Sequence, residues 1–178
     1  MKSTAFAKAL EGEDPQLVKT FVEYHKSNGG GSRYVKFDHF FRNIKKQVEF
    51  DRSLASALEK YALITSQGLL TCELVPGVID IFDYFNSKGV RCYVASGGAE
   101  GEVRYCLGEL GLSRYFDGIY GSPRTKIDHL EELRANNLLG APCVYFGDAK
   151  SDLDAAKAFG LDFVFISSYS DWENGLGY

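Results

Sequence analysis

Apolar residues recur every three or four positions along the first part of the chain, from Pro15 to about Gln67, which is the spacing of amphipathic helices. The residues that carry this repeat are Leu17, Val18, Phe21, Val22, Tyr24, Val35, Phe37, Phe40, Phe41, Leu54, Leu58 and Tyr61. The Ser-Asn-Gly-Gly-Gly-Ser run at 27–32 is a turn signal, and Asp51 and Ser53 are residue types that begin helices. The pattern predicts one all-helical unit over residues 1–70.

After Pro76 the pattern changes to short β-rich runs that alternate with amphipathic helical stretches. Strands are predicted at 90–95, 117–120, 143–146 and 163–166. Helices are predicted at about 77–88, 100–110, 126–136 and 152–159. This alternation is the sequence signature of β-α-β units, so residues 71–178 are expected to form an α/β unit around a parallel sheet.

Composition narrows the classes of function. With 178 residues, of which 45% are hydrophobic, the chain can bury a core without disulfides or metal ions. Its 20 Lys and Arg residues and 24 Asp and Glu residues give a net charge of −4 without a long basic run, which argues against nucleic-acid or membrane binding. The four cysteines lack metal-ligand spacing. The sequence contains no signal-peptide-like or membrane-length apolar stretch, so a cytoplasmic protein is expected.

Polar residues follow three of the predicted strands, and ligands of parallel sheets bind at the carboxyl ends of the strands. The first strand leads into Ser96, Gly97 and Gly98, where a hydroxyl and unhindered amides at a helix start suit a phosphate. The second leads to Lys126 at the start of the next helix. Taken alone, the first feature is more typical of an ordinary turn than of a phosphate site, and a lone lysine is usually solvated.

The third strand ends in Gly147-Asp148-Ala149-Lys150-Ser151-Asp152, which places two carboxylates four residues apart on a strand-to-helix turn. Mg²⁺ prefers hard oxygen ligands, so Asp148 and Asp152 are candidate metal ligands. The alternative is that Asp152 is an N-terminal helix charge and Asp148 a turn former. The ordered set of serine, lysine and paired aspartates, each after a strand, is hard to explain by chance.

This ordered set resembles the motifs of the haloacid-dehalogenase-like (HAD) hydrolase superfamily. Ala95-Ser96 is similar to its motif II, Lys126 to motif III, and the run 147–152 to motif IV. The stretches 76–78 and 154–161 resemble the phosphoglycolate-phosphatase-like branch. The resemblance implies a Rossmann-like parallel sheet, with the first 70 residues as an α-helical cap.

The resemblance also implies a phosphatase that acts on a small phosphorylated metabolite through an aspartyl-phosphate intermediate with Mg²⁺. In such an enzyme Ser96 and Gly97 would bind the phosphoryl group, and Lys126 would stabilise that group and the nucleophile. Asp148 and Asp152 would position Mg²⁺, and Lys126 and Asp148 would be the catalytic residues of this chain.

One motif of the family has no match in the sequence. Motif I is a hydrophobic strand that ends in Asp-x-Asp and supplies the nucleophile, whereas the only Asp-x-Asp here is Asp152-Leu153-Asp154, in motif IV and the helix after it. The opening residues 2–6 resemble the helix that follows motif I. The chain is therefore expected to lack the central strand of its sheet, to be inactive as given, and to self-associate through the strands left unpaired.

The glycine-rich segment of the helical unit suggests a contact with substrate. Arg33 and Lys36 follow the run of three glycines and could touch an anionic substrate, since caps of this family close over the active site. The alternative is a helix connection with solvated charges. His25, His39 and His129 lie on helical segments without ligand spacing and are interpreted as structural or surface residues.

Two functions are compatible with these residues. The first is a HAD phosphatase whose nucleophile segment is not in this sequence. The second is a non-catalytic HAD-like module that binds phosphate or a partner. An intact set of Ser96, Lys126, Asp148 and Asp152 favours the enzyme, because a site long out of use has no reason to keep all four.

Overall fold

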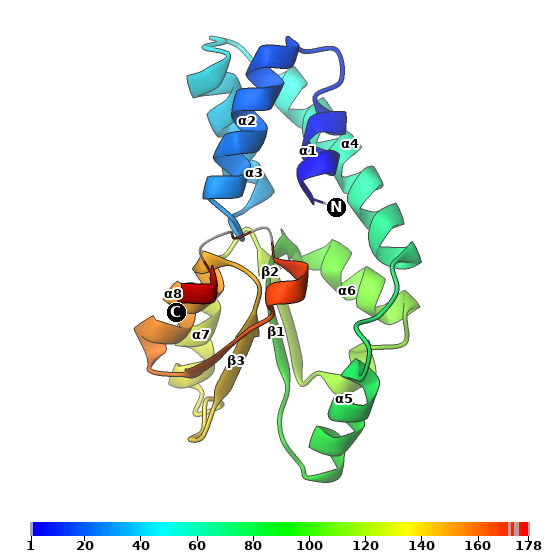
Figure 1. Cartoon of the computed structure of the whole chain (residues 1–178), viewed down its shortest axis with the longest axis vertical. Coiled ribbons are helices and arrows are strands. Elements are labelled where there is room, and N and C mark those ends of the chain that lie inside the picture. The colour runs from blue at the N-terminus through cyan, green and yellow to red at the C-terminus, as the bar shows by residue number, and fades with distance from the viewer. Residues whose placement is uncertain (1, 171, 173–174, 178) are drawn as a thin grey trace.

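The computed structural model describes residues 2–170, 172 and 175–177. Consecutive helical elements form one end of the molecule, coloured from blue to cyan-green in Figure 1. They are α1 (Lys2–Ala9), α2 (Pro15–Ser27), α3 (Arg33–His39), a π-helical turn (Phe40–Ile44) and α4 (Asp51–Thr71). The helical character predicted for this region is observed, while the division into domains at residue 70 stays a prediction.

Local sequence explains where α2 and α3 begin. The Oδ1 atom of Asp14 accepts hydrogen bonds from the amides of Gln16 at 2.7 Å and Leu17 at 3.3 Å, and Pro15 suits the first turn of α2 because its missing N–H would have no partner there. Ser32 caps α3 by accepting a hydrogen bond from the amide of Tyr34 at 3.3 Å. The glycine-rich run lies in the loop that connects the end of α2 to Ser32.

An aromatic cluster holds the helices of this end together. The ring centroid of Phe6 in α1 lies 5.4 Å from that of Phe21, 5.2 Å from Phe37 and 4.3 Å from Tyr61. Phe21, Phe37 and Phe40 are fully buried. Complete burial of one such side chain contributes about 1.5–3 kcal/mol, so α1 is an integral part of this core.

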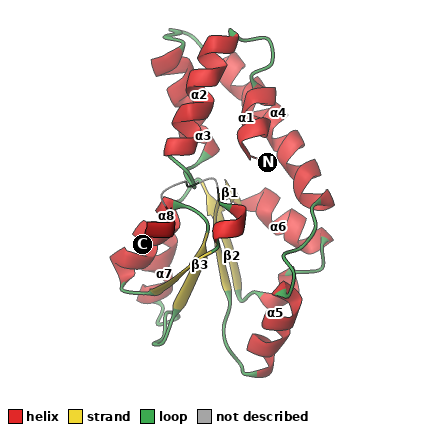
Figure 2. Cartoon of the chain, in the orientation of Figure 1, coloured by secondary structure: helices red, strands yellow, loops and turns green. Residues whose placement is uncertain are grey.

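The other end of the molecule alternates helices and strands as predicted. Its elements are α5 (Val78–Ser87), β1 (Tyr93–Ala99), α6 (Glu100–Glu109), β2 (Gly118–Ser122), α7 (Lys126–Ala135), β3 (Val144–Gly147), α8 (Lys150–Phe159) and β4 (Asp162–Phe165). Short 3₁₀ turns lie between α6 and β2 at Ser113–Tyr115 and after β4 at Ser167–Tyr169 and Gly175–Gly177. Figure 2 shows the strands between α6 on one side and α7 and α8 on the other. The α/β fold class is thereby confirmed.

The strands form two separate parallel pairs. β1 pairs with β2 from Tyr93 opposite Gly118 to Ala95 opposite Tyr120, and β3 pairs with β4 from Val144 opposite Asp162 to Gly147 opposite Phe165. Within the described residues, β1 and β3 are not hydrogen-bonded neighbours. The edges of these two strands that face away from their partners therefore lack a strand neighbour.

Several boundaries differ from the sequence prediction, and two of them lie at the cavity. The first strand extends to Ala99, so Ser96 and Gly97 lie in the strand and not at a helix start. The reason is Ser122 at the end of β2, whose hydroxyl donates to the carbonyl oxygens of Gly97 at 2.8 Å and Gly98 at 3.1 Å and keeps that segment extended. The last long helix begins at Lys150, two residues earlier than predicted.

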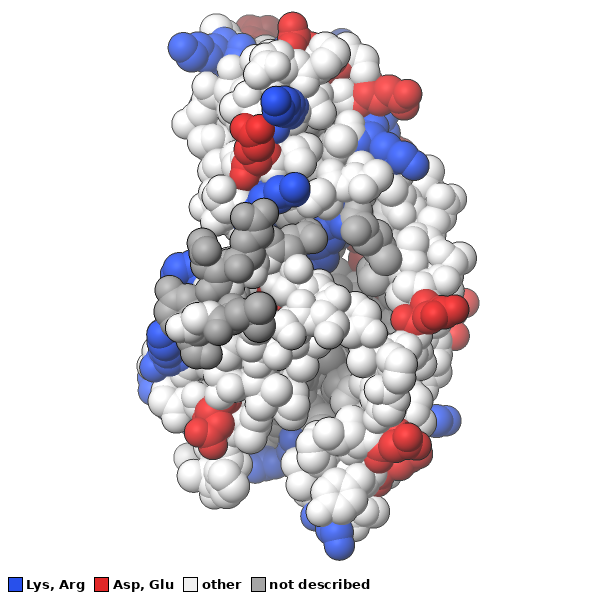
Figure 3. Space-filling view, viewed as in Figure 1, with Lys and Arg blue, Asp and Glu red and all other residues white. Residues whose placement is uncertain are grey.

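The surface shows no patch of one charge on the face seen in Figure 3, where Lys and Arg side chains are interspersed with Asp and Glu. Apolar side chains are exposed on one face of the β3–β4 pair, including Val144 (45% exposed), Phe146 (47%) and Val164 (40%). Among the described helices, none has both the length and the hydrophobicity needed to cross a membrane.

Candidate phosphate-binding site

A cavity of about 270 Å³ lies between the helical end and the carboxyl ends of the strands. Its lining from the α/β end includes Ser96, Gly97, Lys126, Asp148 and Asp152, the residues that the sequence singled out at three strand ends. The helical end contributes Lys2, His25, Lys26, Ser27, Gly29 and Gly30. The structure therefore brings the predicted phosphate and metal residues to one cavity, while their individual roles stay predictions.

A buried ion pair between Lys126 and Asp152 organises one wall of the cavity. The ammonium of Lys126 donates to Oδ1 of Asp152 and, at 3.2 Å, to Oγ of Ser151, and the two paired side chains are only 11% and 6% exposed. Lysine has three N–H donors, so one is left for a ligand within the described part of the chain. The ion pair therefore connects the first turn of α7 to the first turn of α8.

Helix capping places both members of this pair. Thr125 and Asp128 form a capping box at the start of α7, in which the amide of Thr125 donates to Asp128 Oδ2 at 2.7 Å and the amide of Asp128 donates to Thr125 Oγ1 at 3.1 Å. Lys126 is the first residue of that helix. In α8, Oδ2 of Asp152 accepts the amide of Ala149 at 3.0 Å. Each side chain is thus fixed at a helix N-terminus directly after a strand.

Tyr145 of β3 completes the surroundings of Asp152. Its hydroxyl donates to Asp152 Oδ1 at 3.3 Å. Burial, and then the negative charge of Asp152, raise the pKa of Tyr145 far above its ordinary value, so it stays protonated and a donor. Tyr145 was not identified from sequence. Its hydrogen bond with Asp152 depends on where β3 places its side chain, which the sequence pattern does not give.

The loop from α2 to α3 lies directly on the strand ends. An added Cβ on Gly97 would meet the carbonyl oxygen of Gly30 at 2.5 Å, and one on Gly30, where φ is +77°, would meet Oγ of Ser151 at 1.9 Å. Both positions require glycine for this close approach. The predicted turn therefore forms the roof of the cavity, and Ser96, whose Oγ accepts the amide of Gly98 at 3.0 Å, lies beneath it.

Arg33 and Lys36, the predicted cap contacts with substrate, do not line the cavity. Both are buried, so the alternative of solvated charges is also wrong. Arg33 forms an ion pair with Glu102 of α6 at 2.7 Å, and its guanidinium lies 4.6 Å from the ring centroid of Tyr61. Lys36 donates from Nζ to Nδ1 of His25 at 2.8 Å. Arg33 therefore connects the two ends of the molecule, and Lys36 lies behind a cavity residue.

His25 was interpreted from sequence as a structural or surface residue, and its place in the lining of the cavity was not predicted. It is 4% exposed and lines the cavity one turn before the glycine-rich loop. The sequence signal that could have indicated this role was the position of His25 just before the glycine-rich loop. His129, interpreted in the same way, is buried, and its Nε2 lies 2.9 Å from the carbonyl oxygen of Gly121.

The carboxylates of the cavity do not by themselves make a magnesium site. Both oxygens of Asp152 are engaged, one with Lys126 and Tyr145 and the other with the amide of Ala149. Asp148 is exposed and lines the cavity. In the described part of the chain, no group of three or more His, Cys, Asp or Glu side chains is placed to hold a metal ion. Asp148 is the carboxylate of the described lining that is left available to an ion, and Mg²⁺ held by one carboxylate would take its remaining ligands from water and from a substrate phosphate.

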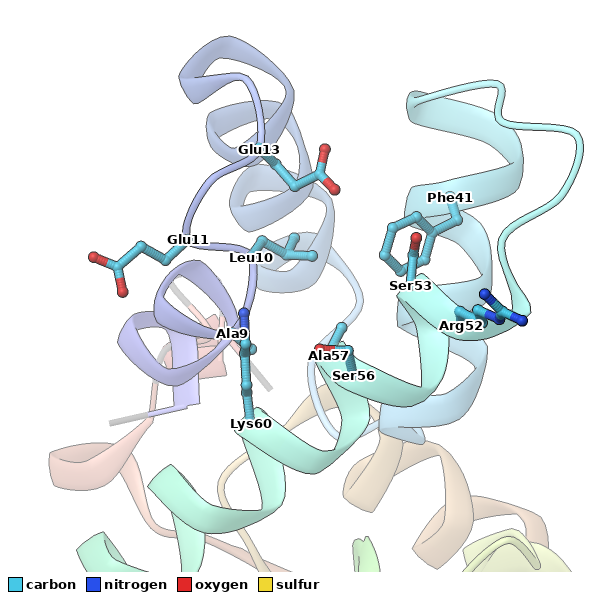
Figure 4. Close-up of a pocket in the computed structure, with 10 residues that line it drawn as sticks. All are labelled: Ala9, Leu10, Glu11, Glu13, Phe41, Arg52, Ser53, Ser56, Ala57 and Lys60. Atoms are coloured by element: carbon cyan, nitrogen blue, oxygen red, sulfur yellow. The ribbon is translucent and has the colours of Figure 1, made fainter.

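A second cavity, of about 310 Å³, lies within the helical end and is separate from the strand ends. Figure 4 shows that it is bordered by the segment after α1 and by the first turns of α4. Small residues such as Ser53, Ser56 and Ala57 line much of it, and Glu13 is engaged by Lys45 at 2.7 Å. It contains none of the residues predicted to bind phosphate.

The fold and the first cavity define a class of α/β protein in which a helical end lies over a cavity at the carboxyl ends of parallel strands. Residues 14–166 match the family model described as haloacid dehalogenase-like hydrolase, so the chain belongs to that family. The resemblance drawn from the sequence motifs is thereby confirmed.

Curated relatives point to the same branch of the family. Phosphoglycolate phosphatase 1 of Pseudomonas aeruginosa is 32% identical over 121 residues, which cover 65% of this chain and 43% of that protein. Phosphoglycolate phosphatase of Pseudomonas fluorescens is 29% identical over 126 residues, or 67% of this chain and 45% of that protein. The chain thus spans less than half the length of these relatives.

Solved structures share the fold at low sequence identity. A predicted phosphoglycolate phosphatase from Haemophilus somnus has a TM-score of 0.70 at 17% identity, over 96% of this chain and 84% of that chain. A phosphonoacetaldehyde hydrolase-like protein from Oleispira antarctica has a TM-score of 0.72 at 15% identity, over 94% of this chain and 66% of that chain. These likenesses establish the fold alone.

Proposed function

We propose that this protein binds the phosphate group of a small phosphorylated metabolite at its strand ends, as the phosphate-holding part of a HAD phosphatase. The observation that carries the proposal is the shared cavity of Ser96, Gly97, Lys126, Asp148 and Asp152. Names of the curated relatives favour a short phosphorylated acid such as phosphoglycolate as the ligand. A cytoplasmic location remains our expectation.

The chemistry follows from what each residue can offer. The third N–H of Lys126, the hydroxyl proton of Ser96 and the backbone amides near Gly97 are donors for phosphoryl oxygens, and the lysine charge would offset charge that develops during transfer. Phosphoryl transfer in this family would use an aspartate nucleophile and Mg²⁺, and Asp148 is the residue that would contact the ion.

A second candidate is a non-catalytic phosphate-binding module. The observation that favours it is the single Asp-x-Asp of the sequence, which the structure places in α8 and not at a strand end. Among the residues that the structure describes, no separate carboxylate nucleophile is therefore identified. We expect phosphate binding without turnover from the 178 residues alone.

Calorimetric titration of the full chain with inorganic phosphate tests the proposal, with the aryl ester p-nitrophenyl phosphate as a parallel test for turnover. Wild type should bind phosphate, and Lys126→Ala should weaken binding by about tenfold or more, because a charge-assisted contact is lost. Lys19→Ala, at an exposed lysine of α2, is the matched control and should have no effect. Equal binding by wild type and Lys126→Ala would overturn the site. Turnover of the ester by the pure chain would overturn the expectation of inactivity.

A further inference from the structure

His25 and Lys36 form a buried, hydrogen-bonded pair at the roof of the cavity. Lys36 Nζ lies 2.8 Å from His25 Nδ1, and the two residues are 3% and 4% exposed. The ring of Phe6 supports the pair, with its centroid 4.5 Å from the imidazole centroid and 5.5 Å from Lys36 Nζ. The histidine lines the cavity and the lysine lies behind it, so the lysine acts through the histidine.

The positive charge of Lys36 has no carboxylate partner among the described residues. The charges that act on it are those of Lys2 and Lys126, which are also cations and which also line the cavity. Buried charges are normally paired, as Arg33 on the same helix is paired with Glu102. Lys126 is paired with Asp152, but the charge of Lys36 has no such partner in the described part of the chain. A buried, unpaired lysine charge beside a cavity that is lined by further cations favours an anionic ligand there.

The hydrogen bond also fixes the chemistry of the imidazole. An ammonium can only donate, so Nδ1 of His25 must accept, and the neutral ring then carries its proton on Nε2. A ring held in this form is a hydrogen-bond donor backed by a positive charge. Such a donor interacts more strongly with a carboxylate than with an uncharged group.

The pair is held over the cavity by the fold. Lys36 and Arg33 are three residues apart on α3, and the ion pair of Arg33 with Glu102 fastens that helix to α6 of the α/β end. Gly30 and Gly97 are in contact just beneath. Lys126, which lines the same cavity from α7, is the proposed phosphate contact. The lining thus combines the proposed phosphate contacts at the strand ends with His25 of the helical end.

We propose that His25, positioned by Lys36 and backed by the lysine charge, recognises a carboxylate on the leaving group and so selects phosphorylated acids over phosphorylated alcohols. This inference rests on the proposed phosphate site. His25 is the residue that contacts the ligand, and Lys36 is a positioning residue.

Calorimetry on the full chain at pH 7 tests the pair with inorganic phosphate, ethyl phosphate and 2-phosphoglycolate, the two esters sharing a two-carbon skeleton. Wild type should bind phosphoglycolate about tenfold or more tightly than ethyl phosphate, since a charge-assisted hydrogen bond is gained. Lys36→Met and His25→Phe should each bring the ratio near one. His25→Gln, which keeps an N–H donor, should retain part of the preference, and Lys19→Met should retain all of it.

The outcomes separate the two proposals. If wild type binds none of the three probes, the phosphate site fails and the specificity pair fails with it. If wild type binds phosphate but does not distinguish the esters, or if Lys36→Met and His25→Phe keep the preference, the specificity pair is overturned while the phosphate site stands.

Discussion

Replacing Lys36 with methionine should stabilise the folded chain at neutral pH, although it removes a residue that we assign to ligand recognition. Burial is the main reason why the pKa of Lys36 falls from its ordinary 10.5 to about 8, and the charges of Lys2 and Lys126 lower it further. At pH 7 the buried amine of Lys36 is still protonated, but it binds the proton less tightly in the folded chain than in the unfolded chain. This difference lowers the stability of the folded state. Methionine has a similar length and shape and carries no charge.

The magnitude follows from the two pKa values. Each pKa unit corresponds to about 1.4 kcal/mol, so the gap between 10.5 and about 8 costs the native state about 3 kcal/mol at pH 7. Loss of the hydrogen bond to His25 returns about 1 kcal/mol of this. We expect a net gain of about 2 kcal/mol in the free energy of unfolding at pH 7.

The sign of the pH dependence is a second check. Between pH 8 and 10.5 the unfolded wild type binds the proton that the native state has released, so the stability of wild type rises with pH over this window. The advantage of Lys36→Met should therefore shrink through the same window and be close to zero near pH 10.

Urea unfolding at pH 7 and pH 10 measures both effects. Lys19→Met, at an exposed position on α2, is the control and should change stability by no more than about 0.5 kcal/mol. The reasoning would be refuted if Lys36→Met were less stable than wild type at pH 7, or if its stability difference from wild type did not vary with pH.

Three further perturbations test other parts of the structure. A double-mutant cycle with Arg33→Met and Glu102→Gln should give a coupling of about 1–3 kcal/mol in chemical unfolding, because the pair is largely buried, and a coupling near zero would contradict a link between the two ends. Gly97→Ala should destabilise the chain by about 1–3 kcal/mol in thermal or urea unfolding, because its Cβ would lie 2.5 Å from the carbonyl oxygen of Gly30. The control Gly101→Ala in α6, which has open space around it, should be neutral or stabilising. Sedimentation should detect self-association that grows with concentration, through the strand edges of β1 and β3 that lack neighbours, and a strictly monomeric chain at high concentration would rule it out.

Much of the α/β end could be predicted because its signals are local. Lys126 follows the capping residue Thr125, and Asp152 lies in the first turn of a helix after a strand, so spacing alone placed both near the strand ends. The extent of the first strand could not be predicted in this way. It depends on Ser122, which is distant in sequence and holds Gly97 and Gly98 extended.

The cap contacts were predicted less well because they depend on pairs distant in sequence. Arg33 was expected to face a substrate, but its partner Glu102 lies 69 residues away. Lys36 is paired with His25 across the glycine-rich loop, which no periodic pattern reveals. The sequence identified the charged residues next to the glycine-rich loop. Their partners became known only from the three-dimensional structure.

The position of a bound oxyanion tests the central claim most directly. A crystal structure of the full chain grown with tungstate, whose metal atom gives an anomalous signal, would locate a phosphate mimic without assumptions about its site. We expect a single strong peak in the cavity, with tungstate oxygens within about 3.5 Å of Ser96 Oγ and Lys126 Nζ. A peak in the helical cavity lined by Ser53 and Ala57, or no peak at the strand ends at saturating tungstate, would contradict it.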